Sequence, residues 1–378
     1  MKDAPPLPNQ GWDFPFQRPL LPPPERWLSY LAPAYAHHWF SNFGPVAQAL
    51  ERRLEARTGR AVQVVANGTV AITAALLALD RQGPVVLPSF TFPATLMAIL
   101  EAGCTPLLAD VDPQTWEMGP TQVEAALPYL SIPPVAILGV RPFGLCRDQA
   151  SLEAWCRERE IPLILDSAAA FGGTLEDGRS VGSQGFMETF SLHATKVFAV
   201  GEGGAIACDP QWQARLRQVI NFGMENGHPS RAGVNGKLSE FAAAIGLAQD
   251  DVFGEHLRIR RAAAERYRAF FATYWPQWAP PRNPGQPPWQ AYPLMAPSHD
   301  ALVTVLQAAG GQGIQLRRYY HPALHQTTFG AVYARMPLPV SDVLTSRMLC
   351  FPIYSDLEAE EQGSLLDRLS RIGVGRAG

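Results

Sequence analysis

The chain has 378 residues, a length that predicts two or three domains. Hydrophobic residues make up 47% and charged residues 17%, so we expect a large core and exclude a disordered chain. The net charge of −3 argues against nucleic-acid binding through a basic surface. The proline-rich N-terminus lacks the apolar core of a signal peptide, and no run of 18 apolar residues exists, so we expect a cytoplasmic protein without a membrane span.

The chain contains an odd number of cysteines, and none of them forms a Cys-x-x-Cys pair. They are Cys104, Cys146, Cys156, Cys208 and Cys350. These spacings do not match a zinc site, and the pattern is typical of reduced thiols in the cytoplasm. We therefore expect neither a metal site nor a disulfide framework.

Short apolar runs alternate with helical patterns from residue 62 to residue 208. The expected strands are 62–66, 84–88, 105–112, 135–140, 162–168, 187–193 and 204–208, and the expected helices are 70–80, 93–103, 121–130 and 151–160. Continuous apolar strands separated by helices favour a mainly parallel sheet that is covered on both faces. The fold class is therefore α/β.

The second part of the chain begins with a long helical pattern from Leu238 to Trp275, which we interpret as a connector between domains. A proline-rich loop at 280–288 follows, and helical patterns at 301–310 and 360–373 belong to a second mixed unit. We predict an extended N-terminal segment (1–40), a large domain (41–250) and a small C-terminal domain (251–378).

Polar residues stand at the carboxyl ends of several expected strands, where ligands bind in sheets of this kind. Asn67, Gly68 and Thr69 join a strand to a helix. The free N–H groups at a helix N-terminus bind phosphate, although many such turns only cap the helix.

Asp166 and Lys196 are two further candidate residues in this region. Asp166 ends the run PLIL and needs a positive partner, which is either a structural one or a cationic ligand atom such as a pyridinium nitrogen. Lys196 lies within SLHATKVFAVGEGGAI and is a candidate for Schiff-base chemistry, or else a surface lysine with a buried stem. A phosphate cradle, a carboxylate and a lysine in this order are the groups that pyridoxal 5′-phosphate requires.

An ordered series of segments extends this pattern from about Trp39 nearly to the C-terminus. The segments are WFSNFGPVAQALE, ANGTVAITAALLAL, LPSFTFPAT, DSAAAFGG, SLHATKVFAVGEGGAI, NFGMENG, GVNGKLSEFAAAIGLAQ and CFPIYSDL. The chain resembles the DegT/DnrJ/EryC1/StrS sugar aminotransferases in these segments. That resemblance implies the fold type I (aspartate-aminotransferase-like) architecture, with pyridoxal phosphate bound in the large domain.

The resemblance also implies roles for individual residues. Lys196 would form the Schiff base with the cofactor, and Asp166 would pair with the ring nitrogen. Gly68, Thr69 and Ser191 would hold the phosphate, and Phe92 would stack on the ring. Asn235 would reach the phosphate bound by a neighbouring subunit, which requires a homodimer with the active site at the interface.

One position departs from the family pattern. A histidine or glutamine usually follows the aspartate by three residues and binds the phenolic oxygen of the cofactor, but this chain has Ala169 there. Relatives with histidine in place of the lysine are dehydratases, so Lys196 favours transamination.

The implied substrates are L-glutamate and a nucleotide-linked keto sugar. His193, in the form S-x-H-A-T-K, is similar to enzymes that aminate C4, whereas C3 enzymes more often carry tyrosine and proline there. We expect a dTDP-4-keto-6-deoxyhexose to become a dTDP-4-amino-4,6-dideoxyhexose, although His193 could equally be a packed side chain. Residues in regions that line the sugar site of relatives are Asn42, Gly44, Arg317, Tyr319 and His321. The arginine would bind the diphosphate or lie solvated on the surface.

Three other functions stay open at this point. They are a C3 keto-sugar or cyclitol aminotransferase, a sugar dehydratase that does not transaminate, and a non-catalytic sensor on the same fold. The presence of both Lys196 and Asp166 argues against the sensor.

Overall fold

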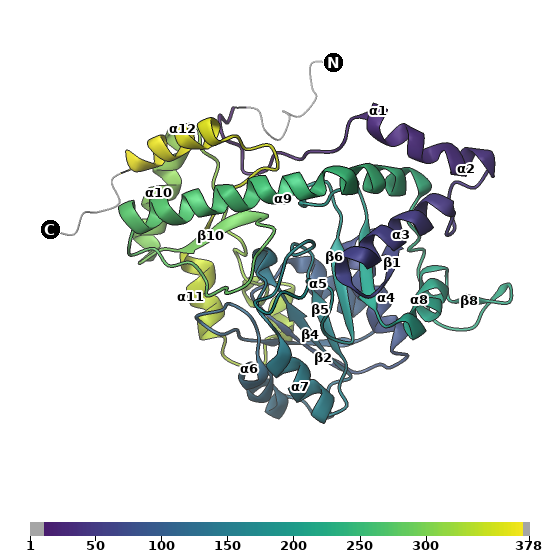
Figure 1. Ribbon diagram of the computed structural model, residues 1–378. Helices are drawn as coiled ribbons and strands as arrows, with labels where there is room; N and C mark the ends of the chain where they lie inside the picture. Colours follow the sequence, from purple (N-terminus) through teal and green to yellow (C-terminus); the bar gives the residue numbers. More distant parts are fainter. Residues whose placement is uncertain (1–10, 373–378) are drawn as a thin grey trace, which may run out of the picture.

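A seven-stranded sheet forms the centre of the computed structural model, which describes residues 11–372 (Figure 1). The strand order is β1-β7-β6-β5-β4-β2-β3, and only β7 runs antiparallel to its neighbours. The strands are β1 (Ala61–Val65), β2 (Pro84–Pro88), β3 (Thr105–Ala109), β4 (Ala136–Val140), β5 (Leu163–Asp166), β6 (Met187–Ser191) and β7 (Gly204–Cys208). The mainly parallel sheet that the sequence predicts is thus present.

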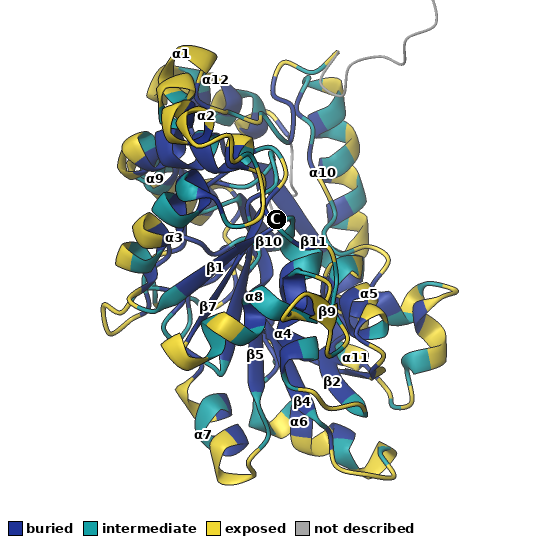
Figure 2. Ribbon diagram, turned by 90° about the vertical axis from the view of Figure 1, so that its right-hand side faces the viewer, coloured by how far each residue is buried: buried dark blue, intermediate teal, exposed yellow. Residues whose placement is uncertain are grey.

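Helices cover both faces of this sheet. In chain order, the helices of the whole described chain are α1 (Pro24–Trp27), α2 (Ala32–Ala36), α3 (Pro45–Thr58), α4 (Gly68–Ala78), α5 (Pro93–Glu101), α6 (Pro120–Ala126), α7 (Ala150–Glu158), α8 (Gln213–Ile220), α9 (Glu240–Tyr274), α10 (His299–Gly311), α11 (Pro339–Arg347) and α12 (Ala359–Ser370). Helices α4, α5 and α8 share one apolar cluster, whereas α3 and the first part of α9 pack into another. Figure 2 shows the central strands buried between these layers.

Alternating side chains of the strands supply these two clusters. Val62 and Val64 of β1 pack on the α3 side, and Val65 packs on the α4 side. Because successive side chains of a strand point to opposite faces, a strand that is apolar on both faces must be covered twice. This explains why the strands are continuous apolar runs.

Helix α9 connects the two parts of the molecule (Figure 1). Its Ser239 cap accepts a hydrogen bond from the Ala242 N–H at 3.2 Å, and its 35 residues continue without interruption. The first part packs on the large sheet, whereas Ala263, Tyr267 and Phe271 belong to the core of the small unit. The expected boundary between residues 250 and 251 therefore lies inside a single helix.

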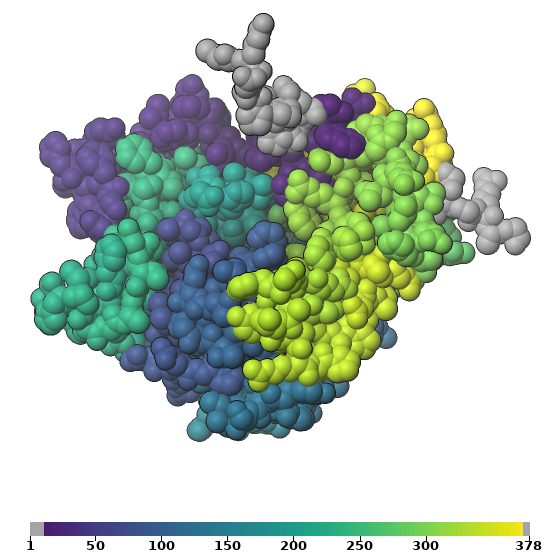
Figure 3. Space-filling model, turned by 180° about the vertical axis from the view of Figure 1, so that it is seen from behind, coloured from purple at the N-terminus to yellow at the C-terminus, as the bar shows by residue number. Residues whose placement is uncertain are grey.

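The small unit consists of the antiparallel pair β10 (Ala291–Met295) and β11 (Met348–Pro352), with α10 and α12 packed beside it. Segments after β10 return to the large domain. Asp110 after β3 accepts hydrogen bonds from the N–H groups of Val340 and Ser341, both at 2.8 Å, and so caps α11. Figure 3 shows this part of the chain lying against the residues around β2 and β3.

The N-terminal segment is more regular than we expect from its sequence. Residues 24–36 form α1, a 3₁₀ turn and α2 rather than an extended strand, because prolines at the first helical turns suit helix starts. Before them, Phe14 pairs with Ile314, and the N–H of Phe16 donates to Gln315 Oε1 at 2.9 Å. The first ten residues lie outside the described part of the chain. A short hairpin, β8 (Met224–Glu225) and β9 (His228–Pro229), projects from the large domain.

All five cysteines are buried and free. No helix within residues 11–372 combines the length and apolar character that a membrane crossing needs. The same residues contain no cluster of three or more His, Cys, Asp or Glu side chains that could hold a metal ion.

Candidate active site

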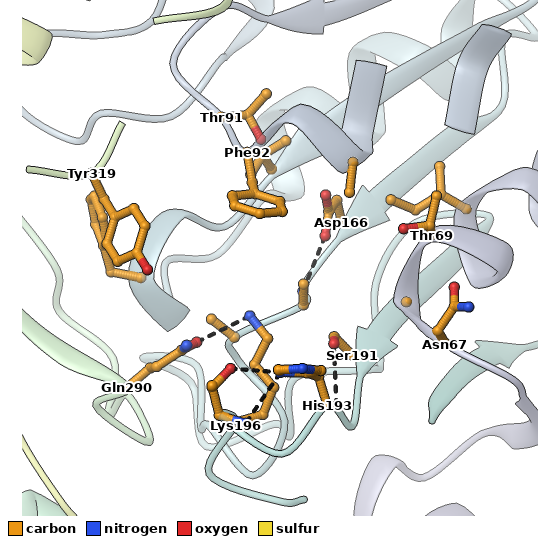
Figure 4. Close-up of a pocket in the computed structure, with 18 of the residues that line it drawn as sticks. Asn67, Thr69, Thr91, Phe92, Asp166, Ser191, His193, Lys196, Gln290 and Tyr319 are labelled. Atoms are coloured by element: carbon orange, nitrogen blue, oxygen red, sulfur yellow. Dashed lines mark hydrogen bonds between the residues drawn. The ribbon is translucent and has the colours of Figure 1, made fainter. Parts of the chain in front are cut away.

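One cavity of about 690 Å³ lies at the carboxyl ends of the parallel strands, between the large and small domains. The large domain supplies the residues that follow β1, β2, β4, β5 and β6. The small unit supplies Gln290 and Tyr319, and the N-terminal segment supplies Phe16 and Gln17. Figure 4 shows how several of these side chains converge.

The N-terminus of α4 forms one end of the cavity. Asn67 Oδ1 accepts the Val70 N–H at 2.9 Å, while the N–H groups of Gly68 and Thr69 make no hydrogen bond within the described residues. Ser191, at the end of β6, lies close enough that a Cβ on Gly68 would be 2.8 Å from its Cβ. Two free backbone donors, a positive helix end and a nearby hydroxyl make a cradle for a phosphate group.

The structure explains why the turn after Lys196 has a glycine at position 204. It pairs with both Val65 and Ser191, and a Cβ there would lie 2.5 Å from the Asn67 carbonyl oxygen. Only glycine lets β7 pass this close to the start of α4. The close neighbour of Gly204 is therefore the backbone of the cradle itself.

Asp166 ends β5 with its carboxylate buried in the cavity wall. Its Oδ2 accepts the Thr95 hydroxyl at 2.8 Å, and its Oδ1 accepts the Ala168 N–H at 3.1 Å. Burial raises the pKa of Asp166, and these two hydrogen bonds together with the charge of Lys196 oppose the rise. A cationic ring nitrogen at this position would stabilise the carboxylate further.

Lys196 enters the same cavity from the loop between β6 and β7. Its Nζ donates to Gln290 Oε1 at 3.3 Å (Figure 4). Burial lowers the pKa of Lys196 to about 8, while the charge of Asp166 acts in the opposite direction. A lysine with such a pKa is partly a free amine near neutral pH, which is the form that attacks a carbonyl carbon.

Phe92 stands at the mouth of the cavity, at the N-cap of α5. Its side chain is held on the backbone that follows β2, where it projects toward the space between Asp166 and Lys196 (Figure 4). It is 54% exposed in the single chain. Together, the cradle, the carboxylate, the amine and this aromatic ring fit the phosphate, ring nitrogen, aldehyde and ring face of pyridoxal phosphate.

Two of the expected substrate residues also line the cavity. His193 Nδ1 accepts the Thr195 N–H at 3.2 Å and contacts the Thr195 hydroxyl at 2.8 Å, and its Nε2 lies 3.6 Å from Glu202. Tyr319 enters from the small domain with its hydroxyl accepting a bond from Arg317 at 3.0 Å. Ala169 lines the cavity with a methyl group and offers no polar side-chain atom.

The other expected site residues lie outside the lining of this cavity. Gly44 faces Glu240, whose carboxylate accepts the N–H groups of Val46 and Ala47. Arg317 packs over the ring of Phe16, and His321 contacts Arg318 on the surface. The two asparagines are likewise elsewhere: the Asn42 carbonyl accepts the Trp39 indole N–H, and Asn235 is exposed.

Some residues of the site give no signal in the sequence. Gln290, in the cavity wall, follows a proline-rich loop, and Thr95, which donates to Asp166, lies inside a helix. Arg141 lines the cavity as well, but its guanidinium is buried and donates to Glu188 at 3.0 Å and Gln184 at 2.9 Å. Only their long-range contacts bring these residues to the site.

Comparison with known proteins identifies the family. Residues 25–370 match the model of the DegT/DnrJ/EryC1/StrS aminotransferase family. Protein Rv3402c of Mycobacterium tuberculosis is 33% identical over 92% of this chain and 87% of its own length. The dTDP-4-amino-4,6-dideoxy-D-glucose transaminase of Shigella dysenteriae is 30% identical, with coverage of 91% and 94%. A UDP-N-acetyl-3-dehydro-α-D-glucosamine 3-aminotransferase of Acidithiobacillus ferrooxidans is 31% identical, with coverage of 84% and 86%.

A solved structure supports the same assignment. The crystal structure of DesI in the presence of its TDP-sugar product has a TM-score of 0.86 and 30% identity, and the match covers 97% of this chain and 95% of DesI. The chain belongs to the DegT/DnrJ/EryC1/StrS aminotransferase family and has the fold type I architecture. It is a pyridoxal-phosphate-dependent aminotransferase, and its named relatives are sugar aminotransferases.

Proposed function

We propose that this enzyme moves an amino group from L-glutamate to C4 of a dTDP-4-keto-6-deoxyhexose and so forms a dTDP-4-amino-4,6-dideoxyhexose. The observation that carries the proposal is the placement of Lys196 and Asp166 on one cavity with the cradle at Gly68 and Thr69. The Shigella transaminase and DesI, which are named for or crystallised with a dTDP-type sugar, support the choice of sugar.

The chain's own residues have distinct tasks in this reaction. When bound, pyridoxal phosphate supplies an electron sink for negative charge at the α-carbon of the donor. Asp166 would hold the ring nitrogen, and the Thr95 hydroxyl donates a hydrogen bond to the Asp166 carboxylate. Lys196 would be the acid–base group that takes a proton from that carbon and delivers it to the carbon that was the cofactor's aldehyde, because its lowered pKa allows both forms near the operating pH.

A C3 keto-sugar aminotransferase is the second candidate. The Acidithiobacillus relative, which is named for position 3, is as similar to this chain as the Shigella enzyme. Position 4 is supported by the resemblance of the S-x-H-A-T-K segment to C4 enzymes, and the His193 of that segment lines the cavity with Lys196. Its hydrogen bonds to Thr195 leave Nε2 as the ring nitrogen that can meet a substrate.

We also propose a homodimer with shared active sites. In the single chain Phe92 is half exposed and the cavity is open beside it. Within the described residues, two arginine or lysine side chains line the cavity, Arg141 and Lys196. Arg141 is already paired with Glu188. Anionic groups of the substrates therefore need further cations, and the exposed Asn235 with its half-buried neighbour Lys237 is available on another copy.

The first test is an absorbance spectrum of the purified enzyme before and after addition of L-glutamate. We expect a visible cofactor band that is replaced by a near-ultraviolet band, with one 2-oxoglutarate released per site. A band that ignores L-glutamate would contradict the choice of donor. Enzyme with the Lys196→Ala substitution is the matched control and should show no such conversion.

The second test offers the aminated enzyme two acceptors separately. A dTDP-4-keto-6-deoxyhexose should restore the visible band and yield a product with nitrogen at C4, identified by mass spectrometry and NMR. Restoration by a UDP-linked 3-keto sugar alone would favour the second candidate. Sugar that loses water while L-glutamate is unchanged would identify a dehydratase instead.

A further inference from the structure

Gln290 contacts Lys196 from the opposite domain. Lys196 lies on the loop after β6 of the large domain, whereas Gln290 directly precedes β10 of the small unit. Their side chains meet between two neighbouring cavities and line both of them, and Lys196 Nζ lies 3.3 Å from Gln290 Oε1. The amine is therefore pointed at a carboxamide oxygen.

The backbone that presents Gln290 is held in place by Arg260 of α9. The guanidinium of Arg260 is buried and donates to the Trp289 carbonyl at 2.9 Å and to the Ile353 carbonyl at 3.0 Å. It also donates to Ser355 Oγ at 2.8 Å. These bonds tie the residue before Gln290 to the end of β11 and to the connector helix.

Trp289 itself adopts an unusual conformation. Its φ of 56° lies in the left-handed region, which a bulky residue rarely enters. Its ring stacks on Tyr292 with centroids 5.3 Å apart, so packing holds the side chain as well. Residues in such conformations persist where the surroundings determine them, and here the result is the direction of the next side chain, Gln290.

We propose that Gln290 is a positioning residue that receives and aims the Lys196 amine whenever this amine is detached from the cofactor. This inference rests on the proposed role of Lys196 at the cofactor. During transamination the lysine is released and must stay within reach of the donor's α-carbon. A carboxamide oxygen on a fixed backbone holds the amine there without a competing charge.

An acceptor at the amine also favours its protonated form. Burial acts in the opposite direction on Lys196, and Asp166 raises its pKa. Other titratable groups line the two cavities with Lys196. From other elements they are Arg18, Glu101, Arg141, Arg260, Tyr319 and Tyr320, and from its own loop they are His193 and Glu202. The chain has three lysines, Lys2, Lys196 and Lys237, so each amine can be followed separately.

The test measures the pKa of each lysine in the cofactor-free protein by trace acetylation at a series of pH values, with peptide mass spectrometry as the readout. Gln290→Met keeps the size of the side chain and removes the acceptor, so the Lys196 midpoint should fall by at least half a unit. Gln290→Glu replaces the acceptor with a carboxylate, so the midpoint should rise by a unit or more. Lys237 is the internal reference, and Gln114→Met, an exposed glutamine outside both cavities, is the matched control.

Opposite shifts in the two variants would support the proposal, because a general disturbance of the fold would move both in one direction. Unchanged midpoints, or shifts of the same sign, would overturn it. The result is independent of the sugar and of turnover. A separate experiment tests the proposed function. If borohydride reduction still attached the cofactor to the Lys196→Ala protein, the role of Lys196 as the attachment point would be wrong.

Discussion

At the scale of single residues, the site depends on two buried charged groups that face one cavity. Asp166 and Lys196 each lose hydration on burial, which disfavours the charged form of both. Hydrogen bonds from the Thr95 hydroxyl and the Ala168 N–H partly replace the lost hydration of the Asp166 carboxylate. The Lys196 amine has a hydrogen bond to Gln290. Cofactor binding would bring a cationic ring nitrogen to Asp166 and a carbonyl carbon to Lys196.

Replacement of Lys196 tests its role most directly. Lys196→Ala removes the attachment point and the acid–base group, so we expect loss of the visible cofactor band and a fall in turnover of at least about 10²-fold. Borohydride reduction followed by peptide mapping should locate the cofactor at Lys196 in the wild type. A reduced adduct at Lys2 or Lys237 instead would refute the assignment.

The pH dependence of this residue has a definite sign. Because the pKa of Lys196 is lowered to about 8, the fraction of free amine increases as the pH rises through 8. The rate at which cofactor-free enzyme captures pyridoxal phosphate should therefore rise over the range from about pH 7 to 9. Stopped-flow absorbance measures this rate, and a rate that fell with pH over that range would contradict the assignment.

Asp166→Asn keeps the shape of the side chain but removes its charge. The ring nitrogen would lose its counter-charge, so we expect weaker cofactor retention and a fall in turnover of at least about tenfold, equivalent to 1.4 kcal/mol. Equilibrium dialysis and kinetics should show both effects together. Thr95→Val, which removes only the supporting hydroxyl, should produce a smaller change in the same direction.

At the scale of elements, helix starts and strand ends place most of the side chains. The start of α3 is an example with a long-range partner: Glu240, at the first turn of α9, accepts the N–H groups of Val46 and Ala47 at 2.7 and 3.1 Å. A Cβ on Gly44 would lie 2.6 Å from the Glu240 carboxyl carbon. Gly44 thus allows one helix to cap another.

This contact predicts a stability effect. Gly44→Ala should destabilise the protein by pushing the Glu240 carboxylate away, and Glu240→Ala should cost about 1–2 kcal/mol through loss of the cap. Urea unfolding of the cofactor-free protein measures both. The double variant should lose less than the sum of the two single losses, because the clash disappears with the carboxylate. Strict additivity would argue against this packing role.

At the scale of the whole molecule, the described chain leaves part of the cavity mouth open. Phe92, Phe222 and Phe241 are each more than 40% exposed, and Asn235 lies outside the cavity. Lys237 Nζ donates to Asn235 at 2.8 Å and to Asn221 at 3.1 Å, so the Asn235 side chain is held on the surface. A second copy would both bury this surface and complete the site.

Mixing two defective variants tests the shared site. Lys196→Ala and Asn235→Ala should each be impaired as homodimers. After unfolding and refolding as an equal mixture, half of the dimers carry one site with both native residues, which predicts recovery of roughly a quarter of wild-type activity. Activity no higher than the mean of the two variants would mean that Asn235 does not act across the interface. Sedimentation velocity gives the oligomeric state independently.

Local patterns predicted the sheet, and they placed Gly68, Asp166 and Lys196 at or near the ends of strands, where the structure brings all three to one cavity. Each of these follows from the alternation of apolar runs and turns, because residues at strand ends in a parallel sheet meet at one edge. The helices at residues 24–36 were missed, since short proline-led turns have weak periodicity.

The sequence by itself determined the chemical groups of this enzyme and their order, because strand and helix periodicity is encoded locally. Only the tertiary structure decided that Gln290 meets Lys196, that Gly44 faces Glu240 and that Asn235 lies outside the chain's own cavity. These contacts join segments far apart in the sequence. They depend on how the small unit and α9 pack against the sheet, and no local periodicity carries that information.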